Sequence, residues 1–378
     1  MTPHSERELS EAIAGAKAPF RVSGGGTRPI GVFCAQQTLE MSDLRGVILY
    51  EPGALTLVAK AGTPLATIEE ALASEGQRLA FEPMDHRALL GTSGESTIGG
   101  VVAANVSGPR RIQVGACRDF LLGVRFVDGT GRVLKNGGRV MKNVTGYDLV
   151  KLMAGSFGTL GVLSEVSLKV LPASEETAVL LIEGLDDARA VEALGKALGS
   201  PFEVTGAAHI PVGLDKAPVT MIRLEGFAES VSYRAKKLRD LLRGFGDIAI
   251  ETRPRYTVAG WNWVRDVEPF SKRPGDVWRI SVKPSDGPLV AGKLRAAADV
   301  AMLYDWGGGL VWALVPEGFD VRAATRGIKG HARIERACDD VKNHLGVFAP
   351  QGPALERISR ALRAKFDPRG ILNPGLMG

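Results

Sequence analysis

The sequence predicts an α+β protein of two lobes, and its length, its composition and a change of pattern near Thr177 indicate this class. A chain of 378 residues exceeds what a single hydrophobic core normally organises. Hydrophobic residues make up 45% and charged residues 24%, which is ordinary for a globular protein with a substantial core. Up to Pro172 short elements alternate with glycine clusters, whereas from Thr177 strands and longer helices follow in a steadier order. We therefore expect a glycine-rich first lobe and a second lobe built on one sheet.

A short helix is predicted at the start of the chain. Ser5 and Glu8 have the spacing of a capping box, and Leu9 and Ile13 follow on one helical face. A strand at 20–22 then leads into the first glycine cluster, RVSGGGTRP.

Strands at 47–50 and 56–60 are expected before the helix in PLATIEEALASEG. Thr63 is its predicted N-cap, and Gly76 is its predicted C-terminal stop. The segment TIGGVVAANVSG has helical apolar spacing, which predicts a short helix whose N-terminus faces a ligand.

A hairpin around the DGTG turn is predicted in LLGVRFVDGTGRVLKNGG. A helix at 147–154 follows. The alternating segment GVLSEVSLKVLP, which ends at Pro172, predicts a strand that leaves the first lobe.

The second lobe is predicted to have a mixed or antiparallel sheet with helices on one face. TAVLLIEG reads as a strand and DDARAVEALGKALG as a helix, with strands near 202–208 and 219–225 and a helix in SVSYRAKKLRDLLRGFG. A similar order recurs at 277–282, 287–298, 300–305 and 309–315, which indicates two related halves. The final helix, in PALERISRALRAKF, is expected to end at Asp367 and Pro368.

Charge and cysteine content exclude several classes of protein. A net charge of +5 with scattered basic residues weakly favours anionic ligands, and no aromatic-interleaved basic stripe indicates nucleic-acid binding. Cys34, Cys117 and Cys338 form no CxxC pair, which argues against an iron–sulfur cluster, a structural metal site or a disulfide framework in this chain. We therefore predict no metal site and a reducing compartment.

The N-terminal segment MTPHSERELSEAIAGAK carries acids and no apolar run, so we expect neither a signal peptide nor a transit peptide. No segment reaches the ~20 apolar residues of a membrane span. Any membrane contact is therefore expected to be peripheral or through a partner.

Glycine clusters carry the strongest chemical signal. Fifteen glycines lie between Gly91 and Gly161, and glycine lets backbone N–H groups turn toward an anion and approach it closely. No cluster has the dinucleotide pattern GxGxxG between a strand and a helix, and no GxxxxGK[ST] occurs. The pattern predicts a phosphate-bearing cofactor held by several separate loops. The alternative is that the glycines serve turns and close helix packing.

The order of SGGGT, TIGGVVAANVSG and GSFGTLGV resembles that of the flavoproteins with an FAD-binding domain of the vanillyl-alcohol oxidase and p-cresol methylhydroxylase (PCMH) type. The run from GPRRIQVGACRDF to GSFGTLGVL resembles most the FAD-binding subunits of bacterial glycolate oxidases, which accompany a larger flavoprotein subunit and an iron–sulfur subunit. The resemblance implies a PCMH-type domain of two α/β subdomains at 1–173, a cap domain at 174–345 and a C-terminal segment at 346–378 that returns to the first domain.

The resemblance also implies a set of FAD-contacting residues, which fall into four groups along the chain. They are Arg21, Ser23, Gly24, Gly25, Gly26 and Thr27 in a first pyrophosphate loop; Gly91, Thr92, Ser93, Thr97, Ile98, Gly99 and Gly100 in a second; Asn105, Ser107 and Gly108 along the flavin edge; and Gly155, Ser156, Gly158, Thr159, Gly161 and Val162 beside the nucleotide, with Asn373 from the C-terminal segment. Hydroxyls that donate to phosphate and small residues that permit close approach fit these roles.

The chain departs from some relatives in two ways. Where these relatives carry a histidine that attaches FAD covalently, this chain has Gly26 followed by Thr27, so we predict non-covalent FAD. Relatives that oxidise 2-hydroxy acids carry a HGDGNxH motif, whereas this chain has DWGGGLVWAL, with Trp306 and Trp312. Hydride removal from a hydroxy acid calls for a positioned base, and the sequence assigns no catalytic residue.

Three further positions have open interpretations. His86 is either a flavin-edge or substrate residue, or a surface or loop histidine. Arg110 and Arg111 could bind a substrate carboxylate or a neighbouring subunit. Trp261 and Trp263 could line a pocket, a partner surface or the core.

Three functions remain open from the sequence. The first is an FAD-binding subunit of a multi-subunit glycolate oxidase, which oxidises a small 2-hydroxy acid and passes electrons toward an iron–sulfur subunit. The second is a self-sufficient FAD-dependent 2-hydroxy acid dehydrogenase, and the third is a non-catalytic assembly subunit. The first predicts partners in a larger flavoprotein subunit and an iron–sulfur subunit. It also predicts a cytoplasmic location, with possible peripheral attachment of the complex to the inner face of the membrane.

Overall fold

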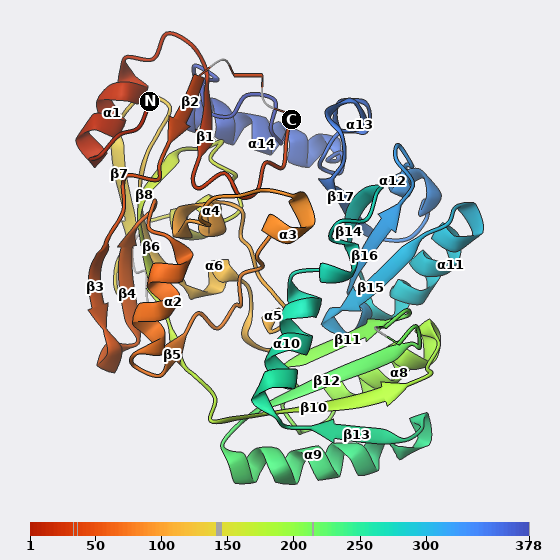
Figure 1. The fold of residues 1–378 in the computed structure, drawn as a ribbon. Helices are drawn as coiled ribbons and strands as arrows, with labels where there is room; N and C mark the ends of the chain where they lie inside the picture. The colour runs from red at the N-terminus through yellow and green to blue at the C-terminus, as the bar shows by residue number, and fades with distance from the viewer. Residues whose placement is uncertain (33, 36, 141–145, 214, 378) are drawn as a thin grey trace.

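A computed structural model describes residues 1–32, 34–35, 37–140, 146–213 and 215–377. The chain forms two lobes side by side, and the last helix returns from the second lobe to the first (Figure 1). The first lobe contains two small sheets and a five-stranded sheet, and the second contains one eight-stranded sheet. This confirms the predicted α+β class.

The N-terminal and C-terminal segments of the chain pack together in the first lobe. Helix α1 (Glu6–Ala14) begins as predicted, with the Ser5 side chain accepting from the Glu8 N–H. Strands β1 (Phe20–Ser23) and β2 (Gln37–Glu40) pair in parallel, and Leu372 adds a parallel bridge to Phe20. The C-terminal segment thus extends the sheet that leads into the first glycine loop.

An antiparallel sheet of order β3-β4-β8-β6-β7 forms the outer wall of the first lobe (Figure 1). Its strands are β3 (Val47–Glu51), β4 (Thr56–Lys60), β6 (Leu121–Val127), β7 (Val133–Gly137) and β8 (Val162–Lys169). Strands β6 and β7 pair as the predicted hairpin. A short antiparallel pairing of β5 (Gln77–Arg78) with β9 (Leu171–Pro172) lies where the chain leaves the first lobe for the second.

Short helices lie on the inner side of this sheet. They are α2 (Leu65–Ala73), α3 (Arg87–Leu90), α4 (Ile98–Ala103), α5 (Arg111–Val114), α6 (Cys117–Phe120) and α7 (Leu149–Met153). The predicted cap by Thr63 is wrong: Pro64 is the N-cap of α2, and the Thr63 hydroxyl instead contacts Gly46 and Lys60. Helix α7 begins at Leu149, later than predicted, because the Asp148 side chain caps it.

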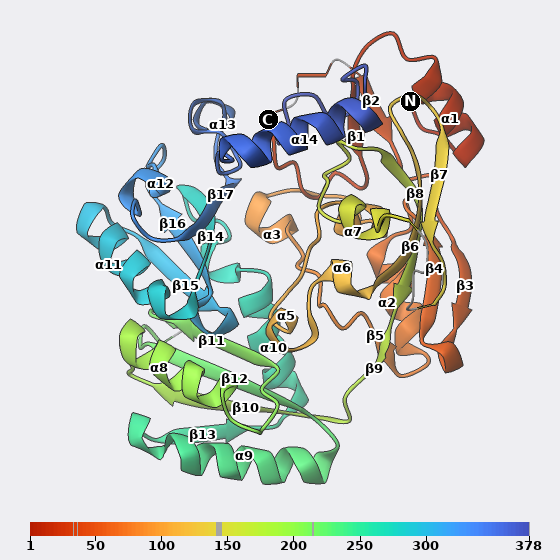
Figure 2. The ribbon, with the colours of Figure 1, turned by 180° about the vertical axis from the view of Figure 1, so that it is seen from behind.

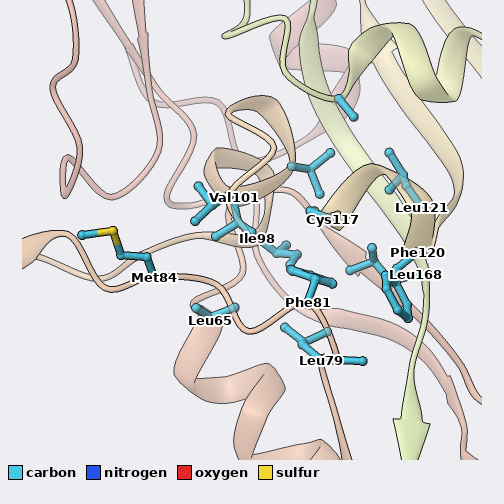
Figure 3. Close-up of a cluster of buried hydrophobic side chains, with 14 of the residues drawn as sticks. Leu65, Leu79, Phe81, Met84, Ile98, Val101, Cys117, Phe120, Leu121 and Leu168 are labelled. Carbon is cyan, nitrogen blue, oxygen red and sulfur yellow. The ribbon is translucent and has the colours of Figure 1, made fainter. Parts of the chain in front are cut away.

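A hydrophobic core fills the space between the five-stranded sheet and these helices. Figure 3 shows Ile98 of α4 among the buried side chains, with Phe120 and Leu168 at one side of the cluster and Met84 at the other. The cluster anchors one face of α4, so that burial of this face helps to fix the position of the helix.

The second lobe has the strand order β13-β10-β12-β11-β15-β16-β14-β17, with antiparallel neighbours throughout the paired strands. Its strands are β10 (Glu176–Glu183), β11 (Gly206–Ile210), β12 (Val219–Gly226), β13 (Ile248–Glu251), β14 (Asp276–Val282), β15 (Ala301–Asp305), β16 (Leu310–Val315) and β17 (Gly330–Arg336). The order of the first four strands is mirrored in the last four, and the halves meet at β11 and β15. This arrangement agrees with the two related halves that the sequence predicts.

Helices cover the outer face of this sheet (Figure 2). Helices α8 (Asp187–Leu198) and α9 (Ala228–Leu242) pack on the first half, and α11 (Gly287–Ala297) and α12 (Val321–Ala324) on the second. Helix α10 (Pro254–Arg265), which the sequence analysis did not predict, packs against the inner face, where Trp261 belongs to the core shared with the first lobe. Trp261 is therefore a core residue. Helices α13 (Asp339–Leu345) and α14 (Pro353–Phe366) lead back to the first lobe.

Buried ion pairs join the lobes. Arg223 of β12 donates to both carboxylate oxygens of Glu82, at 2.9 and 2.8 Å, and its Nε lies 3.3 Å from Glu225. Glu225 also pairs with Arg78, at 2.6 Å, and with Arg110. The second-lobe residues Arg223 and Glu225 are thus neutralised by charges of the first lobe, which fixes how the lobes meet.

Candidate functional site

A groove runs along the inner end of the first lobe, between the loop after β1, helix α4 and the C-terminal segment. Its empty space is about 820 Å³, a figure that includes solvent at its open mouth. The residues that line it are Arg21, Val22, Ser23, Gly24, Gly25, Gly26, Thr27, Arg28, Pro29, Ile30, Met84, His86, Ser96, Thr97, Gly100, Val101, Ala103, Ala104, Val106, Phe157, Asn373 and Leu376.

The first glycine loop, residues 23–27, lies directly against the second loop. A Cβ at Gly25 would lie 1.5 Å from the backbone oxygen of Glu95, and a Cβ at Gly24 would lie 2.3 Å from Thr97 Oγ1. Gly26 has a φ of +71° and open space on its Cβ side. Glycine is therefore needed at 25 for contact between loops, and at 26 for the left-handed backbone.

Hydroxyl groups connect these two loops. Thr27 Oγ1 lies 3.0 Å from Ser96 Oγ, and Thr92 Oγ1 donates to the Thr27 carbonyl at 2.8 Å. Thr97 caps α4 by accepting from the Gly100 N–H. Residues 92–100 thus hold the first loop in place through these hydrogen bonds. Ser96 and Thr97 also present their hydroxyls to the groove.

Asn373 ties the C-terminal segment to the groove. Its side-chain oxygen accepts from the Val22 N–H at 2.7 Å, and its side-chain nitrogen donates to the Phe157 carbonyl at 2.8 Å. The residue is buried and left-handed, with a φ of +46°. It joins three segments that are far apart in the sequence.

Nine of the residues predicted as FAD contacts line this groove: Arg21, Ser23, Gly24, Gly25, Gly26, Thr27, Thr97, Gly100 and Asn373. The others are not among the residues that line the groove: Gly91, Thr92, Ser93, Ile98, Gly99, Asn105, Ser107, Gly108, Gly155, Ser156, Gly158, Thr159, Gly161 and Val162.

Packing explains several positions in this second set. A Cβ at Gly99 would lie 2.7 Å from Ala61, and one at Gly161 would lie 2.6 Å from the Phe126 ring. Val162 and Ile98 are buried in cores. Packing thus accounts for these residues, and their direct contact with a cofactor remains a prediction.

A group of lining residues was not predicted from the sequence: Val22, Arg28, Pro29, Ile30, Met84, Ser96, Val101, Ala103, Ala104, Val106, Phe157 and Leu376. Val101 and Ala104 follow Thr97 at helical spacing, so the face of α4 could have been inferred from that period. Met84 and Leu376 reach the groove only through the tertiary fold.

His86 lies in the groove wall and is 5% exposed, so the interpretation as a surface histidine is wrong. Burial, followed by repulsion from Arg28, lowers the pKa of His86 to about 3. The imidazole is therefore neutral near pH 7. A base with so low a pKa is a poor proton acceptor in that range.

Arg28 brings a cation to the groove. Its Nη2 lies 3.0 Å from Glu335, whereas Nε and Nη1 are buried and have no hydrogen-bond partner. Buried donors without acceptors are costly, and an anionic ligand would satisfy them.

The lining fits a phosphate-bearing flavin nucleotide. Close-set glycines and the hydroxyls of Ser23, Thr27 and Ser96 provide donors for a pyrophosphate. Val101, Ala104 and other small apolar residues provide flat, non-polar walls for rings. The groove thus combines the two kinds of surface that such a cofactor requires.

Asp305, at the end of β15, is a buried carboxyl near the site where the lobes meet. Its side chain accepts from the Trp306 N–H at 2.7 Å, and burial raises its pKa to about 7 despite nearby Arg223. The folded protein therefore binds this proton more tightly than the unfolded chain does. The contribution of Asp305 to stability is thus present at low pH and is lost as the pH rises toward 7.

We expect Asp305→Asn to remove this pH dependence, because asparagine can still accept from Trp306 but does not ionise. Relative to the native chain, the variant should gain stability as the pH rises from about 4 to about 7, by at most ~1.4 kcal/mol per pH unit. Urea unfolding of both proteins across this range measures the difference. A difference that does not vary with pH would refute the assignment.

Within the described part of the chain, no three histidine, cysteine, aspartate or glutamate side chains gather as a metal site. No described helix is both long and apolar enough to cross a membrane.

Comparisons with known proteins agree with this geometry. Residues 1–137 match a family model described as an FAD binding domain. The chain is 37% identical to glycolate oxidase subunit GlcE of Escherichia coli over 98% of this chain and 95% of that protein. It is 24% identical to glycolate oxidase subunit GlcD of Bacillus subtilis, over 100% of this chain and 88% of that protein.

Solved structures with similar folds include 4-ethylphenol oxidase from Gulosibacter chungangensis, with a TM-score of 0.75 and 14% identity over 99% of this chain and 88% of that one. p-Cresol methylhydroxylase gives a TM-score of 0.70 and 13% identity over 99% of this chain and 87% of that one. These likenesses confirm the predicted PCMH-type fold. Together with the similarity to GlcE over nearly the whole chain, they establish that the chain belongs to the FAD-binding oxidoreductase family that includes the glycolate oxidase subunit GlcE.

Proposed function

We propose that this chain is the FAD-binding subunit of a multi-subunit glycolate oxidase that converts glycolate to glyoxylate. The observation that carries the proposal is the glycine-loop groove, in a chain that is 37% identical to GlcE over almost its full length. The cysteines described in this chain are free and do not gather to hold an iron–sulfur cluster. In the proposed complex, electrons therefore pass to a cluster in a separate iron–sulfur subunit. A larger flavoprotein subunit is the other proposed partner.

The two glycine loops would hold the pyrophosphate of FAD, and Asn373 would fix the wall opposite α4. When bound, FAD supplies the acceptor for the hydride that leaves the substrate carbon. Gly26 and Thr27 stand where some relatives carry a histidine, so the loop offers no imidazole for covalent attachment, which supports non-covalent FAD. The remaining predicted contacts, outside the lining, would hold the loops in place.

The acid–base properties of the groove favour action within a complex. His86 is the one histidine among the groove-lining residues, and its pKa of about 3 makes it a weak base. A partner subunit would supply the stronger base, or would itself oxidise the substrate. Location in the cytoplasm, with the complex at the inner face of the membrane, is part of the same proposal.

Anaerobic reduction by glycolate tests the proposal. The chain is purified alone and together with its two partner subunits, and flavin absorbance is followed after glycolate is added. We expect the flavin of the isolated chain to stay oxidised and the flavin of the complex to bleach. Bleaching in the isolated chain would instead identify a self-sufficient dehydrogenase. A flavin-free chain that still restores the complex would identify an assembly subunit.

A further inference from the structure

A group of basic residues lies on the inner face of the second-lobe sheet, outside the groove lining. Arg279 of β14 pairs in register with Arg333 of β17, and Ser281 pairs with His331. Since side chains alternate along a strand, these four residues share one face. The intervening Ile280 and Ala332 belong to the core on the other face.

The first lobe adds Arg111 to this group, and Trp306 connects the two lobes. Arg111 lies 4.8 Å and Arg279 lies 4.9 Å from the centre of the Trp306 ring. Trp306 Nε1 donates to the Gly108 carbonyl of the first lobe at 3.1 Å. The indole thus holds two guanidinium groups from different lobes near each other.

Positive charge exceeds negative charge here. Glu335 pairs with Arg28 at 3.0 Å and with Arg333 at 2.5 Å. Among the described residues, neither Arg111 nor Arg279 forms a direct hydrogen bond or ion pair with an acceptor side chain. Asp119 acts on Arg111, and Glu335 and Asp305 act on Arg279, only at longer range. Two guanidinium groups, Arg28 and Arg333, thus share the single carboxylate of Glu335, whereas Arg111 and Arg279 have no direct ion pair among the described residues.

The pKa shifts agree with this imbalance. Burial, with repulsion from Arg333, lowers the pKa of Arg279 to about 9. Partial burial and repulsion from Arg279, Arg333 and Arg111 lower the pKa of His331. Neighbouring cations that destabilise one another's charge would be stabilised by a bound anion.

The neighbouring residue Arg110 has a different role. Its guanidinium pairs with Glu225 in the buried network between the lobes, and its backbone N–H donates to Glu82. Of the two consecutive arginines, only Arg111 lacks a direct ion pair among the described residues, since Asp119 acts on it only at longer range. Arg110 is therefore structural, whereas Arg111 is available to a ligand.

The arginine group adjoins the cofactor groove. Phe157 lines the groove, and its ring centre lies 5.8 Å from the Arg28 guanidinium and 6.0 Å from that of Arg333. A ligand held by the arginines would therefore lie next to the groove rather than inside it. The half-buried Trp306 and the buried Trp312, whose ring lies 6.0 Å from Arg279, give the site an apolar boundary.

We propose that Arg111, Arg279 and Arg333 form a binding site for the carboxylate of a small 2-hydroxy acid or of its 2-oxo product. The site rests on the proposed function, because it places that carboxylate beside the FAD groove. Guanidinium groups recognise carboxylates through paired, charge-assisted hydrogen bonds. The aromatic boundary favours a small ligand over an extended polyanion.

Calorimetric titration of the FAD-loaded chain with oxalate, an unreactive small carboxylate, tests the site without relying on turnover. We expect the native chain to bind oxalate, and Arg279→Gln and Arg111→Gln each to weaken binding ~10-fold or more, since hydrogen bonds to charged groups are strong. Arg111 and Arg279 belong to different lobes, so a folding defect in one variant would not by itself decide the result. Arg360→Gln is the matched control, because Arg360 is exposed and forms its ion pair with Glu356 on α14. FAD content should be the same in all four proteins.

No oxalate binding by the native chain, or unchanged binding in both variants, would overturn the site. The test is separable from that of the proposed function. Glycolate bleaching in the complex combined with unchanged oxalate affinity in the variants would reject the site and keep the function. Weakened oxalate binding in the variants, without bleaching in the complex, would keep the site and reject the function.

Discussion

Replacing Gly25 with alanine is expected to weaken FAD binding ~10- to 100-fold, which corresponds to the ~1–3 kcal/mol typical of overpacking. The added Cβ would lie 1.5 Å from the Glu95 backbone oxygen, and a backbone atom cannot move aside as the end of a flexible side chain can. The two loops would separate, and the donors that converge on the groove would lose their arrangement. Fluorescence titration of the flavin-free protein with FAD measures the effect.

Gly53→Ala is the matched control for this experiment. Gly53 lies in the same lobe, has no positive φ and has nothing within 4 Å of its Cβ position. Its variant should bind FAD as the native chain does. Native affinity in Gly25→Ala would mean that contact between the two glycine loops does not shape the cofactor site.

Replacing Arg223 with alanine is expected to lower the free energy of unfolding by about 3–5 kcal/mol, the usual cost of removing one partner from a buried ion pair. The change leaves Glu82 and Glu225 short of positive charge at the junction of the lobes. It also removes the guanidinium that lies 4.6 Å from the Trp261 ring centre. Urea unfolding followed by tryptophan fluorescence measures the loss.

Arg7→Ala serves as the control for Arg223. Arg7 also pairs with a glutamate, Glu11 at 2.8 Å, but both side chains are exposed on α1, and exposed pairs contribute little. Its unfolding midpoint should match that of the native chain. If Arg223→Ala unfolds at the same urea concentration as Arg7→Ala, the ion pairs between the lobes do not stabilise the fold.

Local patterns were sufficient to predict much of the first lobe. The capping box at Ser5, the hairpin of β6 and β7, and the glycines that line the groove are encoded within a few residues of sequence. Thr63 shows the limit of such reasoning. Its hydroxyl satisfies Gly46 and Lys60, which tertiary contacts bring close, and so it does not cap the helix.

Long-range contacts explain what the sequence could not predict. His86 looks like an ordinary loop histidine until the fold buries it beside Arg28. Arg111, Arg279 and Arg333 are far apart in the chain, and each follows an unremarkable local pattern. Only the register of β14 with β17, and the contact of Trp306 with the first lobe, bring them together.

The central claim is that the groove between the two glycine loops and Asn373 holds FAD without a covalent bond. Acid precipitation of the purified chain, followed by identification of the flavin in the supernatant, tests this claim most directly. We expect FAD in the supernatant in a stoichiometric amount and a colourless pellet. Flavin that stays with the pellet, or a purified chain that carries no flavin and takes up none when FAD is added, would contradict the claim.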